Sequence, residues 1–282
     1  MARVRSEYDG MSSVAVVKGE RGLEPVFRAI ELIPFKEALL PYDTVLVKPN
    51  LITSHTFETG ITTDPIVVEA VIRKIKELDK KAIVVETEGG ITSPDEAIHE
   101  TGMIEVLERL GTEYINMRKL KDKVELEVAE PRAIQSFKVA RIAIESAIIT
   151  VPSMKTLHHT TITMGLKNMF GMLITRNKFF MHRYGMNNVI YDVCKTLSPT
   201  LSIIDGFYGK SGSGPWSGLP VKMDTIIASI DPVAADATAA RCIGIDPLIV
   251  DHVRWLHETG MGEISDIEVV GDGIDAVYQK WK

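Results

Sequence analysis

Short runs of aliphatic and β-branched residues recur along the chain, and each is followed by a segment that carries helix-start signals. These runs predict strands at residues 44–48, 82–86, 147–151 and 201–205. Continuous apolar runs are typical of strands that are covered on both faces. Between the first two runs, Asp64 stands at a helix N-cap position and Pro65 takes the first helical position. The alternation predicts right-handed βαβ units and an α/β fold with a mostly parallel, doubly wound sheet.

The rest of the chain continues this alternation. Further strands are expected at residues 13–18 and 224–229, an antiparallel edge strand at 124–128, and helices at 22–33, 65–78, 160–173 and 187–197. Three more helix starts carry caps, at Ser93, Asp231 and Asp246. We expect one domain over residues 1–282, built from two lobes, of about 1–135 and 136–282, with a cleft between them.

Composition and charge limit the classes of protein to which the chain can belong. The 282 residues carry a net charge of −6, and the basic residues are scattered, which excludes a dedicated nucleic-acid binder. No apolar run reaches the ~18 residues that span a bilayer, and the first seven residues lack the apolar core of a signal peptide. These patterns predict a cytoplasmic protein with no membrane partner. Cys194 and Cys242 are too few to hold an iron–sulfur cluster within one chain. Few glutamines and many lysines and glutamates point in the direction of a thermophile. The oligomeric state stays open.

Polar residues follow four of the predicted strands. Ligands of open parallel sheets bind at the carboxyl ends of the strands, so these residues are candidates for one site. Any one of them alone is better interpreted as an ordinary loop residue, and only their common placement favours a shared site. The candidates are Lys48 and Asn50, Glu86 and Glu88, Lys155 with His158 and His159, and Asp205.

Residues 152–171 hold the richest polar segment, at a predicted junction of strand and helix. If the helix begins near Thr160, its free N–H groups and the nearby hydroxyls favour an anion, with Lys167 and Asn168 two turns in. We therefore assign anion binding to Lys48, Asn50, Lys155, Thr160 and Asn168. The alternative is a surface helix with a capped start.

Histidines supply the candidates for catalysis and for a metal. His158, His159, Lys167 and Asp205 are the predicted catalytic residues, and only one of the two adjacent histidines should face the site. His159 and His182 are candidate ligands of a divalent metal, since neutral imidazoles bind transition metals and also act as general bases. No metal-binding spacing such as HExxH is present, so a histidine satisfied by its neighbours remains an alternative for His182.

A glycine-rich stretch at residues 206–218 resembles a nucleotide loop but fails the spacing tests for one. We predict a mobile lid beside the site, with Gly212 and Gly214 letting the backbone approach a ligand. The alternative is an ordered surface loop pinned by Pro215 and Trp216. Asp236 lies among alanines, where a carboxylate without a partner is costly, and is predicted to support the site.

The same residues together resemble the family of the domain of unknown function 362. The resemblance rests on Val47-Lys48-Pro49-Asn50, Thr63-Asp64-Pro65, Lys155-Thr156 with His158 or His159, Thr163-Met164-Gly165-Leu166-Lys167-Asn168-Met169-Phe170-Gly171, Asp205-Gly206, Gly212 to Gly218, and Asp231-Pro232-Val233-Ala234-Ala235-Asp236. It implies no general activity. Many members add a ferredoxin-like cluster segment, whose cysteines this chain lacks. A weaker similarity, to the nickel-pincer lactate racemase group, lies in His158 and Lys167 around Gly165.

Three functional hypotheses follow. The first is a small-molecule enzyme, either an isomerase or a metal-dependent redox enzyme, that acts on an anionic substrate or cofactor. The second is a non-catalytic protein that binds a nucleotide-like ligand or serves as a scaffold. The third is a redox accessory that uses a separate electron carrier. Substrate, reaction and metal are not determined by the sequence.

Overall fold

The computed structural model describes residues 11–87, 92–175, 178–214 and 217–281. The first ten residues, Glu88, Pro215 and Trp216 lie outside this range. All the predicted site residues except Glu88 lie within it.

A ten-stranded sheet forms the centre of the molecule, with its main path in the order β12-β1-β11-β10-β7-β2-β3-β4. Along this path β11 runs opposite to the other strands. β8 and β9 extend the sheet beyond the second half of β10. The strands are β1 (Ser12–Lys18), β2 (Thr44–Pro49), β3 (Lys81–Glu86), β4 (Glu113–Asn116), β7 (Ala147–Val151), β8 (Ser153–Leu157), β9 (Thr161–Thr163), β10 (Leu201–Ser211), β11 (Leu219–Ser229) and β12 (Ile267–Gly271). The predicted α/β class with a mostly parallel sheet is confirmed.

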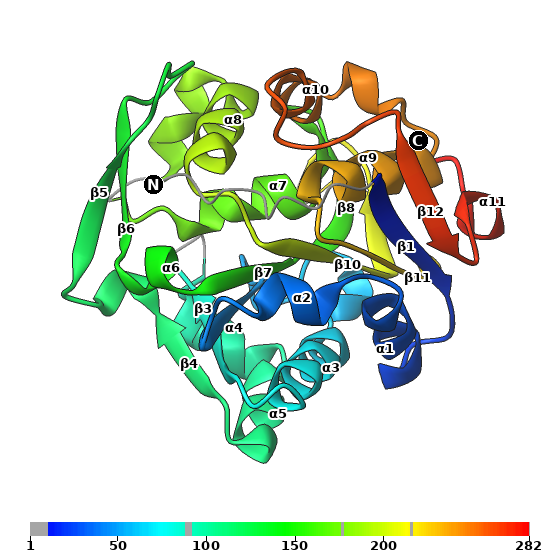
Figure 1. Ribbon diagram of the computed structural model, residues 1–282, viewed down its shortest axis with the longest axis horizontal. Helices are drawn as coiled ribbons and strands as arrows, with labels where there is room; N and C mark the ends of the chain where they lie inside the picture. Colours follow the sequence, from blue (N-terminus) through cyan, green and yellow to red (C-terminus); the bar gives the residue numbers. More distant parts are fainter. Residues whose placement is uncertain (1–10, 88–91, 176–177, 215–216, 282) are drawn as a thin grey trace.

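Helices cover both faces of this sheet (Figure 1). One face carries α1 (Leu23–Glu31), α2 (Phe35–Leu39), α3 (Pro65–Lys76), α4 (Pro94–Glu100) and α5 (Met103–Leu110). The other carries α6 (Ile142–Glu145), α7 (Gly165–Asn168), α8 (Met186–Thr196), α9 (Pro232–Cys242), α10 (Asp251–Glu258) and α11 (Ile274–Val277), with the 3₁₀ helices η3 (Met169–Met172), η4 (Lys178–Tyr184) and η5 (Pro247–Ile249). Phe57 of η1 (Phe57–Thr59) packs against Tyr208 at the first face, whereas Met117 of η2 (Met117–Lys119) belongs to the core of the second face.

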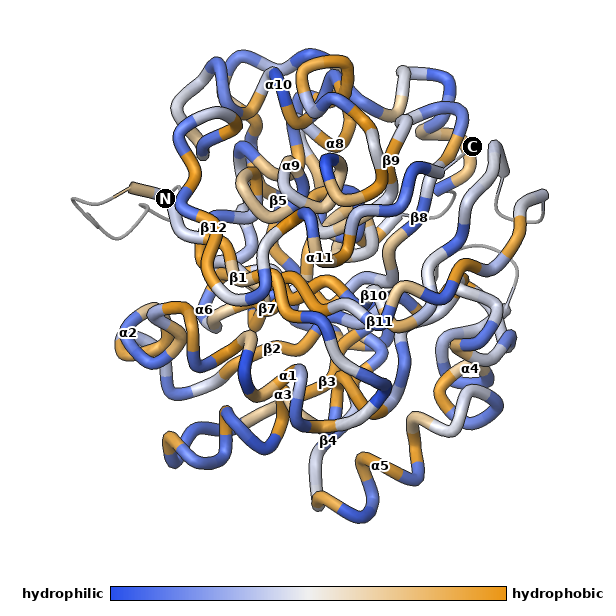
Figure 2. The backbone as a smooth tube through the Cα atoms, turned by 90° about the vertical axis from the view of Figure 1, so that its right-hand side faces the viewer, coloured by the Kyte–Doolittle hydropathy of each residue, from blue (hydrophilic) through white to orange (hydrophobic). Residues whose placement is uncertain are grey.

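Alternation along each strand divides the core between the two faces. In β2, Leu46 packs toward α7 to α10, whereas Val45 and Val47 pack toward α1 and α3. The hydrophobic residues concentrate in the central strands (Figure 2). This sheet crosses the predicted lobe boundary near residue 135, because β1 pairs with β11 and with β12. A cleft between two lobes is therefore not confirmed.

Two local predictions are wrong. The helix expected from Thr160 begins at Gly165, after the short strand β9. The antiparallel strand expected at residues 124–128 is present as β5 (Lys123–Glu127), which pairs with β6 (Ser136–Ala140) in a separate two-stranded sheet. Residues 206–211 of the expected lid continue strand β10.

Candidate functional site

The carboxyl ends of β2, β3 and β7 meet in a buried ion pair. Lys48 at the end of β2 donates to Glu86 Oε2 at the end of β3 over 2.7 Å, and both side chains are almost fully buried. Asn168 in α7 donates to the Lys48 carbonyl and to Thr150 Oγ1, each over 2.9 Å. Removal of one partner of such a pair typically costs 3–5 kcal/mol of stability, because the other charge stays buried.

A second buried lysine continues this network. Lys155 in β8 donates to Asn50 Oδ1 over 2.5 Å, to the Ile61 carbonyl over 2.6 Å and to Ser153 Oγ over 2.7 Å. The Asn50 amide reaches Asn168 Oδ1 over 3.4 Å, which joins the two lysine clusters. Burial lowers the pKa of Lys155 well below its ordinary value, and the neighbouring Lys167 adds to this effect.

Asp205 occupies the corresponding place on β10. Its carboxylate accepts the Asp64 N–H over 2.8 Å and the Phe207 N–H over 3.1 Å. Burial raises the pKa of Asp205 to about 7, and the adjacent Asp64 carboxylate adds to the effect. Asp64 itself binds Arg21 through two hydrogen bonds of 2.6 and 2.9 Å. Both carboxylates thus anchor backbone or guanidinium groups around the start of α3.

The carboxylate of Asp236 lies at the start of α7, where the sequence predicted an anionic ligand. Its two carboxylate oxygens accept the Gly165 and Leu166 N–H groups over 2.8 and 3.0 Å. The start of α7 is therefore occupied by the protein's own carboxylate, and a foreign anion does not find these amides free. Burial raises the pKa of Asp236 to about 7, although the two N–H donors oppose the change.

Two glycines permit this close packing. A Cβ atom at Gly165 would lie 2.9 Å from Asp236 Oδ1, and one at Gly171 would lie 2.5 Å from Lys48 Cε. Real Cβ atoms do not approach other atoms so closely, so these positions need glycine. The segment that carried the family resemblance is thus a cover over the Lys48 ion pair.

Lys167 differs from the other lysines of this region. It is half-buried, and no hydrogen bond or ion pair joins its Nζ to any described residue. Burial lowers the pKa of Lys167 to about 8. Its charge in turn lowers the pKa of Lys155 and of His182, in both cases as a lesser effect than burial. Lys167 is consequently the amine of this region with the greatest capacity for a new partner.

The three predicted histidines form an exposed row. The ring centroids of His158 and His159 lie 5.4 Å apart, and those of His159 and His182 lie 6.2 Å apart. His158 and His159 occupy the turn between β8 and β9, where Thr161 has a φ of 62°, unusual for a β-branched residue. Among the described residues, no group of three or more histidine, cysteine or acidic side chains could hold a metal ion. The metal role of His159 and His182 stays a prediction.

The remaining candidates belong to the β8–β9 turn and the β10–β11 hairpin. Thr160 is buried and lies 3.5 Å, oxygen to oxygen, from Thr163. The backbone of Gly212 exchanges two hydrogen bonds with Thr156 Oγ1, of 2.8 and 2.9 Å. Gly214 N donates to the Ser217 carbonyl over 3.3 Å. These contacts tie the described part of the hairpin tip to β8.

Two side chains near the site carried no signal that singled them out in the sequence. Lys178 in η4 is 8% exposed and donates to Thr87 Oγ1 and to the Gly171 carbonyl. Burial lowers its pKa to about 7. His252 in α10 is fully buried, with its Nδ1 at 2.8 Å from Asn187 Oδ1, and its Nε2 has no partner among the residues that the structure describes. Polar and charged residues stand beside both in the sequence, such as Asp251 and Arg254 around His252, so the local pattern does not distinguish them from exposed residues.

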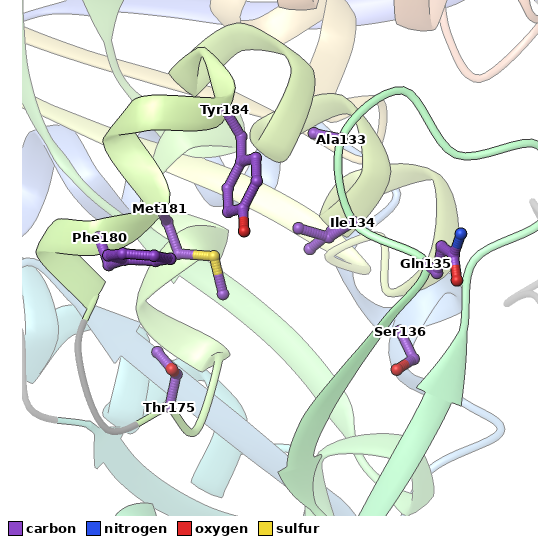
Figure 3. A pocket seen from close by; sticks show the side chains of 8 residues that line it. All are labelled: Ala133, Ile134, Gln135, Ser136, Thr175, Phe180, Met181 and Tyr184. Atoms are coloured by element: carbon purple, nitrogen blue, oxygen red, sulfur yellow. The ribbon is translucent and has the colours of Figure 1, made fainter.

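A separate cavity of about 550 Å³ opens on the other side of η4. Phe180, Met181 and Tyr184 reach into it from η4, opposite Ile134 and Gln135 from the segment before β6 (Figure 3). Ala133, Ser136 and Thr175 complete the lining. The lining carries no charged side chain and shares no residue with the predicted site.

The fold and the buried polar network define an α/β protein whose sheet gathers lysines and carboxylates at one edge. Residues 45–241 match the family model described as domain of unknown function 362, and the chain belongs to this family. It is 26% identical over 230 residues to the thylakoid-associated protein sll1697 of Synechocystis sp., a match that covers 78% of this chain and 69% of that protein. Within the described residues, no helix is both long and apolar enough to cross a membrane. The similarity to the lactate racemase group stays a prediction.

Proposed function

We propose that the protein binds a small anionic ligand at Lys167 and the adjoining histidines, and acts on it as an enzyme. The observation that carries the proposal is the ammonium group of Lys167, which has no oxygen partner in the described part of the chain, whereas Lys48 and Lys155 each have several. A half-buried charge without a partner is costly, and an anion would offset that cost.

The charged side chains around Lys167 indicate which class of ligand the site binds. Burial and, as a lesser effect, the charge of Lys167 lower the pKa of Lys155, and Glu86 and Asp205 are already engaged with Lys48 and with backbone N–H groups. A phosphate or carboxylate group would relieve this excess of positive charge. Lys48, Asn50 and Asn168 then act as a buried frame for the site.

The proposal has two versions, an enzyme and a non-catalytic binding protein. An exposed histidine beside Lys167 supplies a base near neutral pH, which suits an isomerase or a metal-dependent redox enzyme. The alternative, a non-catalytic binding protein, is favoured by the burial and full pairing of Lys48 and Lys155. We propose a cytoplasmic location, which cell fractionation tests; the word thylakoid in the name of sll1697 describes that relative.

Calorimetric titration with inorganic phosphate tests the anion site. We expect Lys167→Gln to weaken phosphate binding about 10- to 150-fold, since a charge-assisted contact contributes roughly 1.5–3 kcal/mol. Lys36→Gln is the matched control, because it removes the same charge from an exposed position on α2. Equal affinities of the wild type and Lys167→Gln, or an absence of binding to the wild type, would contradict the proposal.

A further inference from the structure

The lysines at this edge of the sheet divide by what their amines contact. Lys48, Lys155 and Lys178 each donate to at least two oxygen atoms. Lys167 donates to none within the described residues, although it sits among them and keeps part of its side chain accessible. An amine that donates no hydrogen bond and has no carboxylate partner is the one best suited to react.

Two imidazoles lie within electrostatic range of this amine. The charge of Lys167 adds to burial in lowering the pKa of His182 and of His252. His252 holds its proton on Nδ1, because that atom donates to Asn187 Oδ1, and its buried Nε2 keeps an unpaired acceptor. Burial lowers the pKa of His252 to about 3 and also lowers that of His182, an effect to which His159 adds. Lys155 is the other charged group that faces Lys167.

We propose that Lys167 is a nucleophile that forms an imine with the carbonyl group of a small anionic aldehyde or ketone. The proposal rests on the anion site above and narrows its ligand to a carbonyl compound. The neutral Nζ attacks the carbonyl carbon and forms a C–N bond. The carbonyl oxygen then takes up both amine protons and leaves as water, so that one water molecule is released per imine. Solvent water reaches the partly accessible side chain of Lys167 and carries a proton between the two atoms.

The neutral fraction of each amine predicts how selectively a carbonyl reagent modifies Lys167. With a pKa of about 8, roughly one fifth of Lys167 is neutral at pH 7.4. An exposed lysine of pKa about 10.4 is only about 0.1% neutral at that pH, so the reactive fraction differs by roughly 200-fold. The difference predicts that a carbonyl reagent at limiting concentration modifies Lys167 before an exposed lysine such as Lys36.

Reductive trapping tests the proposal. The full chain is incubated with glyoxylate at pH 7.4, reduced with borohydride, and digested for peptide mass spectrometry. We expect the adduct on Lys167 before the exposed Lys36, protection by inorganic phosphate, and loss of the early adduct in Lys167→Arg. Thermal melts of that variant show whether it is folded, and the ratio of labelling within the wild type needs no variant at all.

The outcomes distinguish the imine proposal from the anion-site proposal. Labelling at Lys36 as fast as at Lys167, or early labelling at Lys178, would overturn the imine proposal. If phosphate binds and weakens in Lys167→Gln while no imine is trapped, the anion site stands without the nucleophile. If Lys167 is trapped but phosphate does not bind, the nucleophile stands and the anion site fails.

Discussion

Lys178 illustrates the cost of an amine that is buried with only neutral oxygen partners. Its pKa of about 7 lies below the ordinary value of 10.5, because burial disfavours the charged form. Between these two pH values the unfolded chain binds a proton at this residue that the folded chain does not. The free energy of unfolding therefore rises with pH in this window, and this contribution is lost as the pH falls through 7.

Lys178→Met should remove that dependence. We expect the free energy of unfolding of the variant, relative to wild type, to fall by about 1.4 kcal/mol per pH unit between pH 7 and 10. Urea denaturation at several pH values measures it. Lys36→Met serves as the control, because it removes the same charge from an exposed position on α2. A constant difference between Lys178→Met and wild type would show that Lys178 is charged in the folded protein.

At the scale of elements, the start of α7 depends on a carboxylate from α9. Asp236→Asn replaces one of the two acceptors by an amide donor, which faces a backbone N–H. We expect a loss of roughly 1–3 kcal/mol of stability, measured by chemical denaturation. Asp246→Asn, at the exposed cap of Leu248 N, should cost less, about 1 kcal/mol or below. Equal losses at the two positions would contradict a special role for the buried cap.

The elements also show how far the sequence could predict this site. The pairing of Lys48 with Glu86 followed from strand order, because β2 and β3 are neighbouring parallel strands whose carboxyl ends share one edge. The start of α7 did not, since its N–H groups are bound by Asp236, 71 residues further along the chain. Local patterns carry no signal for such a contact, and the threonines before Gly165 imitate a helix cap.

The glycines of β10 likewise indicated a loop where the structure has a strand. A Cβ at Gly206 would lie 2.7 Å from the Thr225 carbonyl, and one at Gly209 would lie 2.8 Å from the Met154 carbonyl. These glycines serve close packing within the sheet. In one sequence this use cannot be distinguished from the freedom of a mobile loop.

At the scale of the whole molecule, the β10–β11 hairpin should behave as part of the sheet. Tyr208 pairs with Lys222 and Ser211 with Leu219. We expect slow amide hydrogen exchange at residues 208–211 in the ligand-free protein, compared with the loop at residues 20–22. Thr156→Ala should accelerate exchange at Gly212, whose N–H it leaves without its acceptor. Fast exchange at residues 208–211 in the wild type would restore the mobile lid.

The position of β1 in the sheet affects how the protein folds during its synthesis. This strand is made before its neighbours in the sheet, β11 and β12, which are translated more than two hundred residues later. A nascent chain therefore carries Val14 and Val16 without their neighbouring strands until β11 and β12 have been made. During that interval these residues depend on chaperones or on temporary contacts, and the sheet closes only when its first strand is inserted between two of its last.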